Sequence, residues 1–350
     1  MTENPKHLLD GVSESPHRPS KIAKTAAQNL SNDEEEQQEA PMGPSPRTQR
    51  YLVAIEYIGT RFSGSQQQPN FRTVVGVLED AGVHALSNVC HVDIQRISKR
   101  KPGEVLPPHE QTVVRRAVNH FLQKNEGDIM VIDVRCVPAD FHARFKAQER
   151  TYFYRLLSGP EPLSTFERDR AWHVPEELDI LAMQEACKIL VGHHDFSSFR
   201  AAGCQAKSPI RTLDELTVSE VVSTPYFPSI VERRQNNLIM EDLHASSNKS
   251  ESDLPVSSIS IGNGASGFNG EASLGFGIRR RHRCFVVTAR ARSFLYHQVR
   301  LLVGVLKAVG TGNLTISDVE RILNAKSVTA ASPMAPPCGL YLGHVKYDLP

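Results

Sequence analysis

A carboxylate stands at the head of a tight glycine turn in the stretch Asp80-Ala81-Gly82-Val83-His84-Ala85. An ionised aspartate can act as a nucleophile or a general base when a neighbouring group keeps it charged and directs it. An aspartate before Ala-Gly is more often a simple turn former or the end of a helix. The stretch by itself therefore marks a candidate and does not identify a site.

Three other places carry groups that could do chemistry. Tyr152 lies in an expected strand, where it could pair across a sheet or stack on a planar ligand. Arg300 lies beside the apolar residues of an expected helix, where an arginine often extends its stem along the apolar surface. His193-His194-Asp195 combines metal-ligand types. Because adjacent residues rarely converge on one ion, we expect a turn at a helix end there and no metal site.

Composition narrows the class of protein. None of the six cysteines forms a Cys-x-x-Cys pair, which favours reduced thiols over a redox or metal motif. No apolar run reaches the ~18 residues that a membrane span needs. Residues 1–48 hold five basic and eight acidic residues (net −3), so the other 35 basic and 31 acidic residues give the body +4. That charge is compatible with a polyanionic partner, with the basic runs 99–101 and 279–283 as phosphate contacts or as ordinary solvated loops.

Two segments show no core-forming pattern. Residues 1–48 contain the acidic run 33–36 and a proline cluster, and we expect a disordered tail. The tail has no apolar signal region, and it carries acids where transit peptides avoid them, which favours the cytoplasm or nucleus over an organelle. Residues 241–277 are rich in Ser, Asn, Gly and Glu, and we expect a flexible insertion between two strands.

The rest of the chain alternates irregularly between helical and strand patterns, which favours an α+β fold over a doubly wound parallel sheet. In the clearest helix, 112–124, six apolar residues recur with a 3.6-residue period and predict one buried face. A further helix is expected to begin at Thr73, a plausible N-cap. The expected strands are 51–58, 85–92, 129–136, 150–157, 213–222, 284–291 and 339–347, and the other helices are 179–190, 294–309 and 316–324.

The stretch from Asp80 to Ala85 resembles the active-site loop of the tRNA pseudouridine synthase TruA family. Five further segments resemble motifs of that family and stand in its order, so the resemblance covers most of 51–347. They are Ile55–Thr60 with Gln66 and Gln68, Phe141–Phe145 with Arg150–Tyr154, Gly192–Phe199 with Ile210–Thr212, Ser293–Arg300 with Gly304, and Ala335–Leu342. One departure is Ser65, which stands where the family usually has Trp.

The resemblance implies a particular architecture and partner. Two similar α/β subdomains, here 49–160 and 161–350, would form a mainly antiparallel sheet flanked by helices around a central cleft. A tRNA substrate is implied, especially uridines of the anticodon arm, together with a homodimer that forms the RNA-binding clefts. No membrane association is implied.

The implied reaction detaches uracil from C1′ of the ribose, rotates it and rejoins it through C5. It needs no redox step, metal or cofactor, but it does need a carboxylate, a cation and a surface for stacking. The resemblance assigns Asp80 as the carboxylate, which attacks either the sugar or the base ring. It assigns Arg300 as the ion-pair partner that lowers the pKa of that carboxylate. Tyr152 would stack on the flipped uracil and offer a hydroxyl.

The sequence departs from the family pattern immediately before Asp80, where Leu78-Glu79 replaces Arg-Thr. In the family, the helix that begins at the position of Thr73 runs on for several turns, and a strand then leads into the loop. We therefore expect a helix-strand unit of roughly 15 residues to be missing from the N-terminal subdomain. Two functions remain: a tRNA pseudouridine synthase, or a catalytically impaired or inactive tRNA-binding isoform of one.

Overall fold

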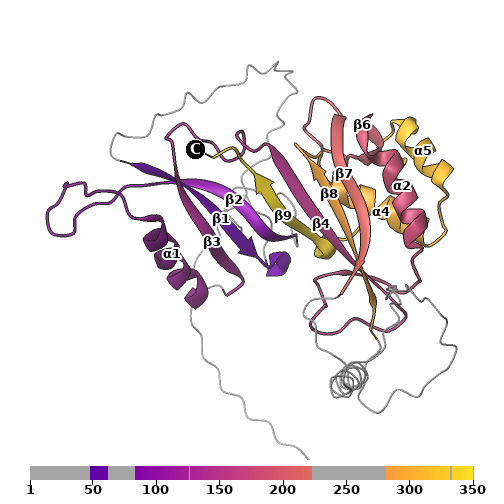
Figure 1. The fold of residues 1–350 in the computed structure, drawn as a ribbon, viewed down its shortest axis with the longest axis horizontal. Coiled ribbons are helices and arrows are strands. Elements are labelled where there is room, and N and C mark those ends of the chain that lie inside the picture. Colours follow the sequence, from indigo (N-terminus) through magenta and orange to yellow (C-terminus); the bar gives the residue numbers. More distant parts are fainter. Residues whose placement is uncertain (1–47, 62–82, 126, 223–280, 332, 350) are drawn as a thin grey trace, which may run out of the picture. The chain divides into compact units, whose positions relative to one another are not determined.

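The structure is a computed structural model that describes residues 48–61, 83–125, 127–222, 281–331 and 333–349. One mixed sheet runs through this part of the chain (Figure 1). The predicted tail, the Thr73 helix start, Asp80 and the insertion 241–277 lie outside the described residues, so those predictions stay predictions.

The strands follow the spatial order β3-β1-β2-β9-β4-β8-β7-β6, with β5 beside β4. Neighbouring strands are antiparallel except for the parallel pairs β2–β9 and β4–β5, which confirms a mainly antiparallel α+β fold. Their bounds are β1 Gln49–Tyr57, β2 His84–Ile94, β3 Ile129–Val137, β4 Glu149–Ser158, β5 Trp172–Val174, β6 Gly192–Asp195, β7 Ile210–Val221, β8 Arg283–Ala291 and β9 Leu340–Lys346.

Strand β9 joins the two halves of the sheet. It pairs with β2 at His84↔Tyr341 and Ala85↔Leu342. It also pairs with β4 along Glu149–Tyr154, with a register shift between Thr151 and Tyr152. The half made of β3, β1 and β2 is therefore linked through a short parallel contact to the half made of β4, β8, β7 and β6.

Four α-helices are described: α1 Gln111–Asn125, α2 Ile180–Leu190, α4 Gln298–Gly310 and α5 Ile316–Ala325. Asp179 caps α2 by accepting from the Ala182 amide at 3.0 Å, and Thr315 and Asp318 form a capping box at α5. Helix α4 begins at Gln298, four residues later than predicted. The cause is His297, whose left-handed backbone (φ 60°) cannot continue a helix.

Buried side chains of the described residues form one large core, two thinner ones and a small cluster of Leu157, Ala171 and Cys284. In the large core, α2, α4 and α5 pack on β4, β7 and β8. In the half that contains β1 and β2, each face of the sheet has its own cluster of buried residues. One face is covered by the Phe141–Ala147 segment, which packs with Leu52 and Val89. The other is covered by α1, whose Val114 packs with Tyr51 and Val53. The N-terminal half is thus covered on both faces, but each of its two clusters contains far fewer buried residues than the large core.

Helix α1 buries less of its apolar face than its periodicity predicts. Val114 is buried and Leu122 packs against the same cluster, but Val113, Val118 and Phe121 are exposed. The helix lies against the edge strand β3, so the width of the contact limits how much of the apolar stripe it can cover.

Among the described residues, none of the helices is long and apolar enough to cross a membrane.

Candidate active site

Tyr152 lies where the two halves of the sheet meet. It points to the same side of β4 as Tyr154 and packs against both the large helix-covered core and the thinner core of Leu52 and Val89. The Phe294 ring meets it edge to face, with 5.2 Å between centroids. Tyr152 is only partly buried. This location gives an aromatic ring a fixed orientation while leaving part of it accessible.

Arg300 is joined to Ala335 through both its side chain and its backbone. Its Nε donates to the Ala335 carbonyl at 2.7 Å, and its own carbonyl accepts from the Ala335 amide at 3.1 Å. Arg300 is buried at 8 % exposure, so it does not extend toward water along the apolar surface, the alternative to a site role. A buried guanidinium needs hydrogen-bonding or charged partners, and the Nε hydrogen bond to the Ala335 carbonyl constrains its direction.

Two glycines let the 333–339 segment approach this site closely. A Cβ on Gly304 of α4 would lie 2.2 Å from the Pro333 carbonyl oxygen, and one on Gly339 would lie 2.5 Å from the Tyr154 ring. Neither position can accept a side chain without moving backbone or a buried ring. The Tyr154 hydroxyl then donates to the Pro336 carbonyl at 2.6 Å. Burial raises the pKa of Tyr154, so this phenol stays a hydrogen-bond donor.

Asp80 lies outside the described residues, but the strand that follows it is firmly anchored through His84. The Gly59 amide donates to His84 Nδ1 at 3.1 Å, and Nε2 lies 3.1 Å from the Asp169 carbonyl and 3.2 Å from the Cys338 carbonyl. A neutral ring with its proton on Nε2 satisfies all three contacts. Burial lowers the pKa of His84, which favours that neutral form.

The candidate metal ligands 193–195 take part in strand pairing and local hydrogen bonds. They belong to strand β6, which corrects the predicted helix-end turn, because Gly192–Asp195 pair with Ile210–Leu213 of β7. His193 Nδ1 lies 2.9 Å from the Thr212 hydroxyl, and Asp195 accepts from Ser197 at 2.7 Å. Within the described residues, no group of three or more His, Cys, Asp or Glu side chains could hold a metal ion.

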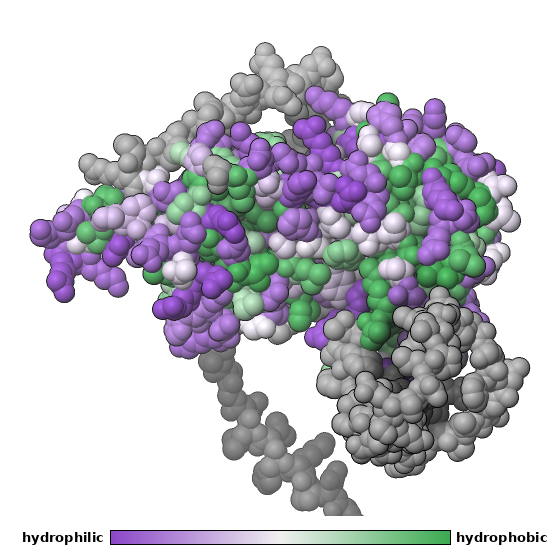
Figure 2. All heavy atoms as spheres, in the orientation of Figure 1, coloured by the Kyte–Doolittle hydropathy of each residue, from purple (hydrophilic) through white to green (hydrophobic). Residues whose placement is uncertain are grey.

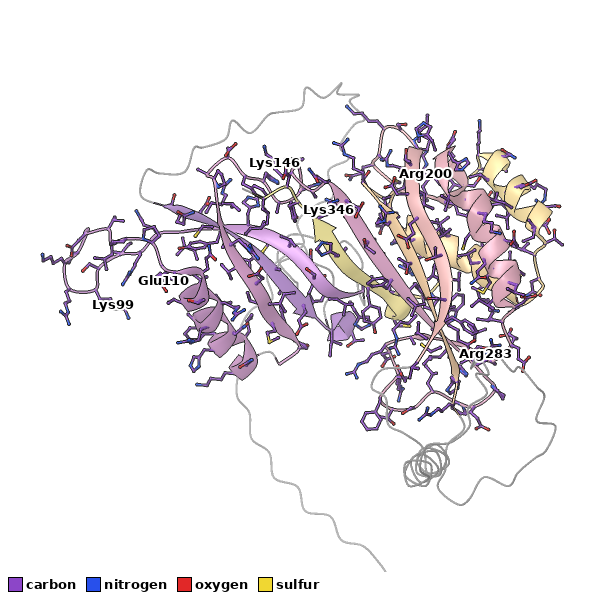
Figure 3. The ribbon with its side chains drawn as sticks, in the orientation of Figure 1. Lys99, Glu110, Lys146, Arg200, Arg283 and Lys346 are labelled. Atoms are coloured by element: carbon purple, nitrogen blue, oxygen red, sulfur yellow. The ribbon has the colours of Figure 1, made fainter. Side chains whose placement is uncertain are left out.

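The two predicted basic runs differ in how they are used. Lys99, at the outer end of the hairpin beyond β2, is exposed (Figure 3). Arg283 is held by Glu220 at 2.8 Å and lies 4.9 Å above the Phe285 ring, so it already has partners inside the fold. Arg279 and Arg280 lie outside the described residues. Other cations gather elsewhere: Lys146, Lys346 and Arg200 lie along the upper edge of the sheet in Figure 3, where Figure 2 shows mostly hydrophilic residues.

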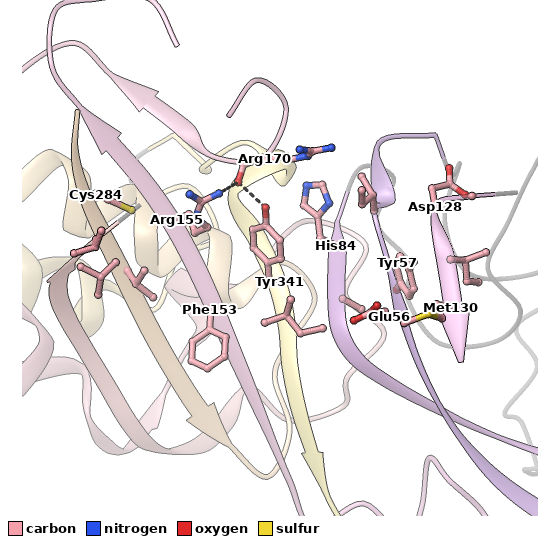
Figure 4. A pocket seen from close by; sticks show the side chains of 18 of the residues that line it. Glu56, Tyr57, His84, Asp128, Met130, Phe153, Arg155, Arg170, Cys284 and Tyr341 are labelled. Carbon is pink, nitrogen blue, oxygen red and sulfur yellow. Dashed lines mark hydrogen bonds between the residues drawn. The ribbon is translucent and has the colours of Figure 1, made fainter. Parts of the chain in front are cut away.

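A cavity of about 760 Å³ opens on the other face of the sheet (Figure 4). Phe153 and Arg155 line it, and because alternate residues of a strand point to opposite faces, it lies behind Tyr152. Neither Tyr152 nor Arg300 contributes to its wall. The cavity and Tyr152 therefore belong to opposite sides of β4.

The cavity wall is mostly apolar, with polar groups at both ends: Arg155, Arg170 and Tyr341 at one end, Glu56 and Asp128 at the other (Figure 4). Arg155 pairs with Glu167 at 2.9 Å and donates to the Arg170 carbonyl, which also accepts from the Tyr341 hydroxyl at 2.7 Å. Ile58 and His84 also line the cavity, and the stretch that contains Asp80 runs between them in the chain. Such a wall suits packing against another apolar element better than binding a charged ligand.

Sequence reasoning missed the roles of His84 and Phe294. Both stand inside segments that the family resemblance had marked, His84 directly after Asp80-Ala81-Gly82-Val83 and Phe294 at the start of the Arg300 segment. Their partners, Gly59, Asp169 and Cys338 for one and Tyr152 for the other, are distant in sequence. Only the marked segments could have drawn attention to them.

Comparison with known proteins adds a second line of observation. A family model described as tRNA pseudouridine synthase matches residues 186–348. The tRNA pseudouridine synthase A of Roseobacter denitrificans is 32% identical over 320 residues, covering 86% of this chain and 96% of that protein. The proteins of the same name from Paramagnetospirillum magneticum and Xanthobacter autotrophicus are 34% and 35% identical, covering 85% of this chain and 95% and 99% of their own. The similarity thus extends over almost the full length of these relatives.

Proposed function

Because the chain belongs to the tRNA pseudouridine synthase family, whose members are isomerases, we propose that it converts uridine to pseudouridine in tRNA with Asp80 as the reacting carboxylate. The observation that carries the proposal is the identity of 32–35% with tRNA pseudouridine synthases A over nearly their whole length. The positions of Tyr152 and Arg300 on one side of β4 support it.

In the proposed reaction the C1′–N1 bond of uridine breaks and a C1′–C5 bond forms. The proton on C5 is lost and N1 gains one, so the nucleotide keeps its composition and no cofactor takes part. Asp80 attacks C1′ of the ribose or the base ring, which in either case leaves the uracil free to rotate before it is rejoined.

Arg300 would provide the positive charge that keeps Asp80 ionised and aims it. The hydrogen bond from its Nε to the Ala335 carbonyl orients the guanidinium, and an oriented guanidinium can pair with a carboxylate in a bidentate geometry. A positive charge paired with an aspartate lowers the pKa of that aspartate, so the carboxylate would be ionised and able to attack at neutral pH.

Tyr152 would receive the uracil once it has left the helical stack of the RNA. The edge-to-face contact with Phe294 and the packing against two cores hold its ring still, and a fixed ring loses little entropy when a base stacks on it. We further propose that the target uridines lie in the anticodon arm and that two chains associate, as the family resemblance implies.

A second candidate function is a tRNA-binding isoform with impaired or no catalysis. The cavity behind Tyr152 favours it, because an apolar hollow bordered by Ile58 and His84 is what a missing helix before Asp80 would leave. In that case tRNA binding persists while the carboxylate is held out of place, and a displacement of ~1 Å can cost about 10²-fold in rate.

The deciding experiment follows the proton on C5. A tRNA transcript that carries tritium at C5 of uridine is incubated with the purified chain, and tritium release is measured together with tRNA affinity. We expect release by the wild type, no release by Asp80→Asn, and tRNA binding by that variant within a few-fold of wild type. Asp214→Asn, an exposed carboxylate on β7, is the matched control.

Each result points to one function. Turnover by Asp80→Asn near the wild-type rate would refute the assigned carboxylate. Tight tRNA binding by a wild-type chain that releases no tritium would favour the inactive isoform. Arg300→Lys should release tritium about 10²-fold more slowly than wild type, because an ammonium cannot reproduce the oriented, bidentate pair.

A further inference from the structure

The rings of His91, His142 and Phe145 form a ring cluster at the edge of the N-terminal half of the sheet, in which neighbouring rings are tilted by 53° and 34°. The ring centroids of His91 on β2 and His142 are 4.6 Å apart, and those of His142 and Phe145 are 4.3 Å apart. The outermost ring, Phe145, is 76 % exposed, more than any other large hydrophobic residue among those described. The inner two rings therefore support an aromatic surface that is open to solvent.

Both histidines are held as neutral rings. The Ala143 amide donates to His91 Nδ1 at 3.4 Å, and the Arg144 amide donates to His142 Nδ1 at 3.2 Å. Burial, followed by the nearby charges of Arg50 and Arg144, lowers the pKa of His142, and burial likewise lowers the pKa of His91. Neutral rings bring no charge of their own to the contact, so the exposed ring of Phe145 rests on uncharged neighbours.

The two chain neighbours of the outermost ring carry positive charges. Arg144 and Lys146 flank Phe145 in the chain, both exposed, and within the described residues no ion pair involves them. Figure 3 shows Lys146 on the same upper edge as Lys346, and Figure 2 shows hydrophilic residues along that edge. An exposed ring next to cations in the chain suits a nucleotide, because the planar base can stack on the ring and the phosphate can contact the cations.

Hydrogen bonds of Arg150 connect the ring cluster to the proposed site. Its guanidinium donates to the Arg144 carbonyl at 3.3 Å and to the Arg292 carbonyl at 2.9 Å, and Arg292 stands two residues before Phe294, the ring that meets Tyr152. One arginine thus ties the segment that carries Phe145 to the segment that supports Tyr152. A nucleic acid bound at one of them would pass near the other.

We infer that Phe145 is a stacking platform for an unpaired nucleobase of the tRNA, with Arg144 and Lys146 contacting the adjoining phosphates. The inference rests on the proposed function, because it takes tRNA to be the ligand. A protein partner fits the surface less well, since a single ring bordered by exposed cations offers little apolar area to bury. A base needs only the area of one ring.

The test measures affinity for an unmodified tRNA transcript at fixed salt, separately from tritium release. Phe145→Ala should raise the Kd about tenfold, the loss of one stacked base. Phe145→Leu keeps apolar bulk without a ring and should weaken binding as Phe145→Ala does. Phe121→Ala is the matched control, because Phe121 is also exposed (62 %) and also meets a histidine, but on α1.

A spectroscopic variant reports stacking directly. The chain has one tryptophan, Trp172, so Phe145→Trp adds a single exposed fluorophore whose emission should be quenched when a base stacks on it. Its Kd should stay within about twofold of wild type. All variants should melt at the wild-type temperature, because an exposed side chain contributes little to the core.

The outcomes separate this inference from the proposed function. If the wild type binds tRNA and Phe145→Ala binds it equally well, the stacking platform is refuted while the tRNA function stands. If Phe145→Leu binds as wild type does, ring stacking is refuted. A wild-type chain with no affinity for tRNA overturns both.

Discussion

In the half of the sheet that contains β4, β7 and β8, three helices bury one continuous core, whereas in the half made of β1, β2 and β3 the buried side chains divide into two thin clusters, one on each face. Arg300 and Tyr152 belong to the first half. The strand that continues from Asp80 belongs to the second. The proposed cation and stacking ring are thus held by the thick core, and Val83, the first described residue after Asp80, packs in that same core before the chain enters β2.

The comparison explains where a change in sequence is tolerated. In the thick half, Gly304 and Gly339 show that even a methyl group has no room. Behind the sheet a cavity of about 760 Å³ stays open, and residues of both halves, such as Tyr57 and Phe153, line it.

Equivalent truncations in the two halves should cost different amounts of stability. Leu302 of α4 is fully buried between helices and sheet, and Leu52 of β1 is nearly so beneath the Phe141–Ala147 segment. We expect Leu302→Ala to lower the free energy of unfolding by about 4 kcal/mol and Leu52→Ala by about 2 kcal/mol, because the thin cluster can relax into the space. Urea unfolding of both variants measures this, and equal losses would contradict the contrast.

Completing the thin half should raise both stability and activity. Inserting a family-like helix and strand that ends in Arg-Thr before Asp80 would place apolar side chains where the cavity is open. We expect the free energy of unfolding to rise by about 2 kcal/mol, the melting temperature by about 5 °C, and tritium release by about 10²-fold. A Gly/Ser insertion of the same length is the control. Cooperative melting and equal turnover by the chain without the insertion would show that no unit is missing.

The pH dependence of stability should report on His84, which joins the two halves. Its pKa in the folded chain is lowered, so the ring is neutral in both states above the unfolded pKa of about 6.5 and contributes no slope there. Below that pH the unfolded chain binds the proton more readily. The free energy of unfolding therefore falls as the pH falls, by at most about 1.4 kcal/mol per pH unit, until the folded pKa is reached.

His84→Asn tests this directly, because an amide oxygen can accept from the Gly59 amide but cannot titrate. We expect the variant to be less stable than wild type at pH 7.5 and to lose less between pH 7.5 and 5.5. Urea unfolding at the two pH values gives the comparison. A pH slope unchanged by the substitution would mean that other groups carry it.

The smallest effect is expected from removing the segments that show no core-forming pattern in the sequence. A chain without residues 1–48, and with a short Gly/Ser bridge in place of 241–277, should melt within about 2 °C of the intact protein. Differential scanning calorimetry of the two chains is sufficient. A large fall would show that one of these segments packs on the body and would add it to one side of the comparison.

Sequence patterns located nearly every long element because the periodicities of strands and helices are local properties. Strands β5 and β6 were missed because each has only three or four residues, too few for a period. The start of α4 was placed four residues early because the apolar pattern runs through His297, and nothing in the pattern reveals its left-handed backbone.

The site was located through the family resemblance, and its contacts were not foreseeable. Nothing near Arg300 in the sequence indicates that Ala335 receives its hydrogen bond, and nothing near His84 indicates Asp169 or Cys338. Apolar spacing also overstated the buried face of α1, since the width of the contact depends on where the helix lies on the sheet. Long-range geometry decided each of these points.

The place of β9 between β2 and β4 has a consequence for how the protein is made. Every other described strand leaves the ribosome first, at about 5–20 residues per second, so the two halves emerge before the strand that joins them. A nascent chain that stops before Leu340 has both halves but leaves the facing edges of β2 and β4 unpaired. Unpaired strand edges promote aggregation, so we expect an unfinished chain to aggregate or be degraded. The sheet face that holds Tyr152 becomes continuous only when translation has passed Lys346.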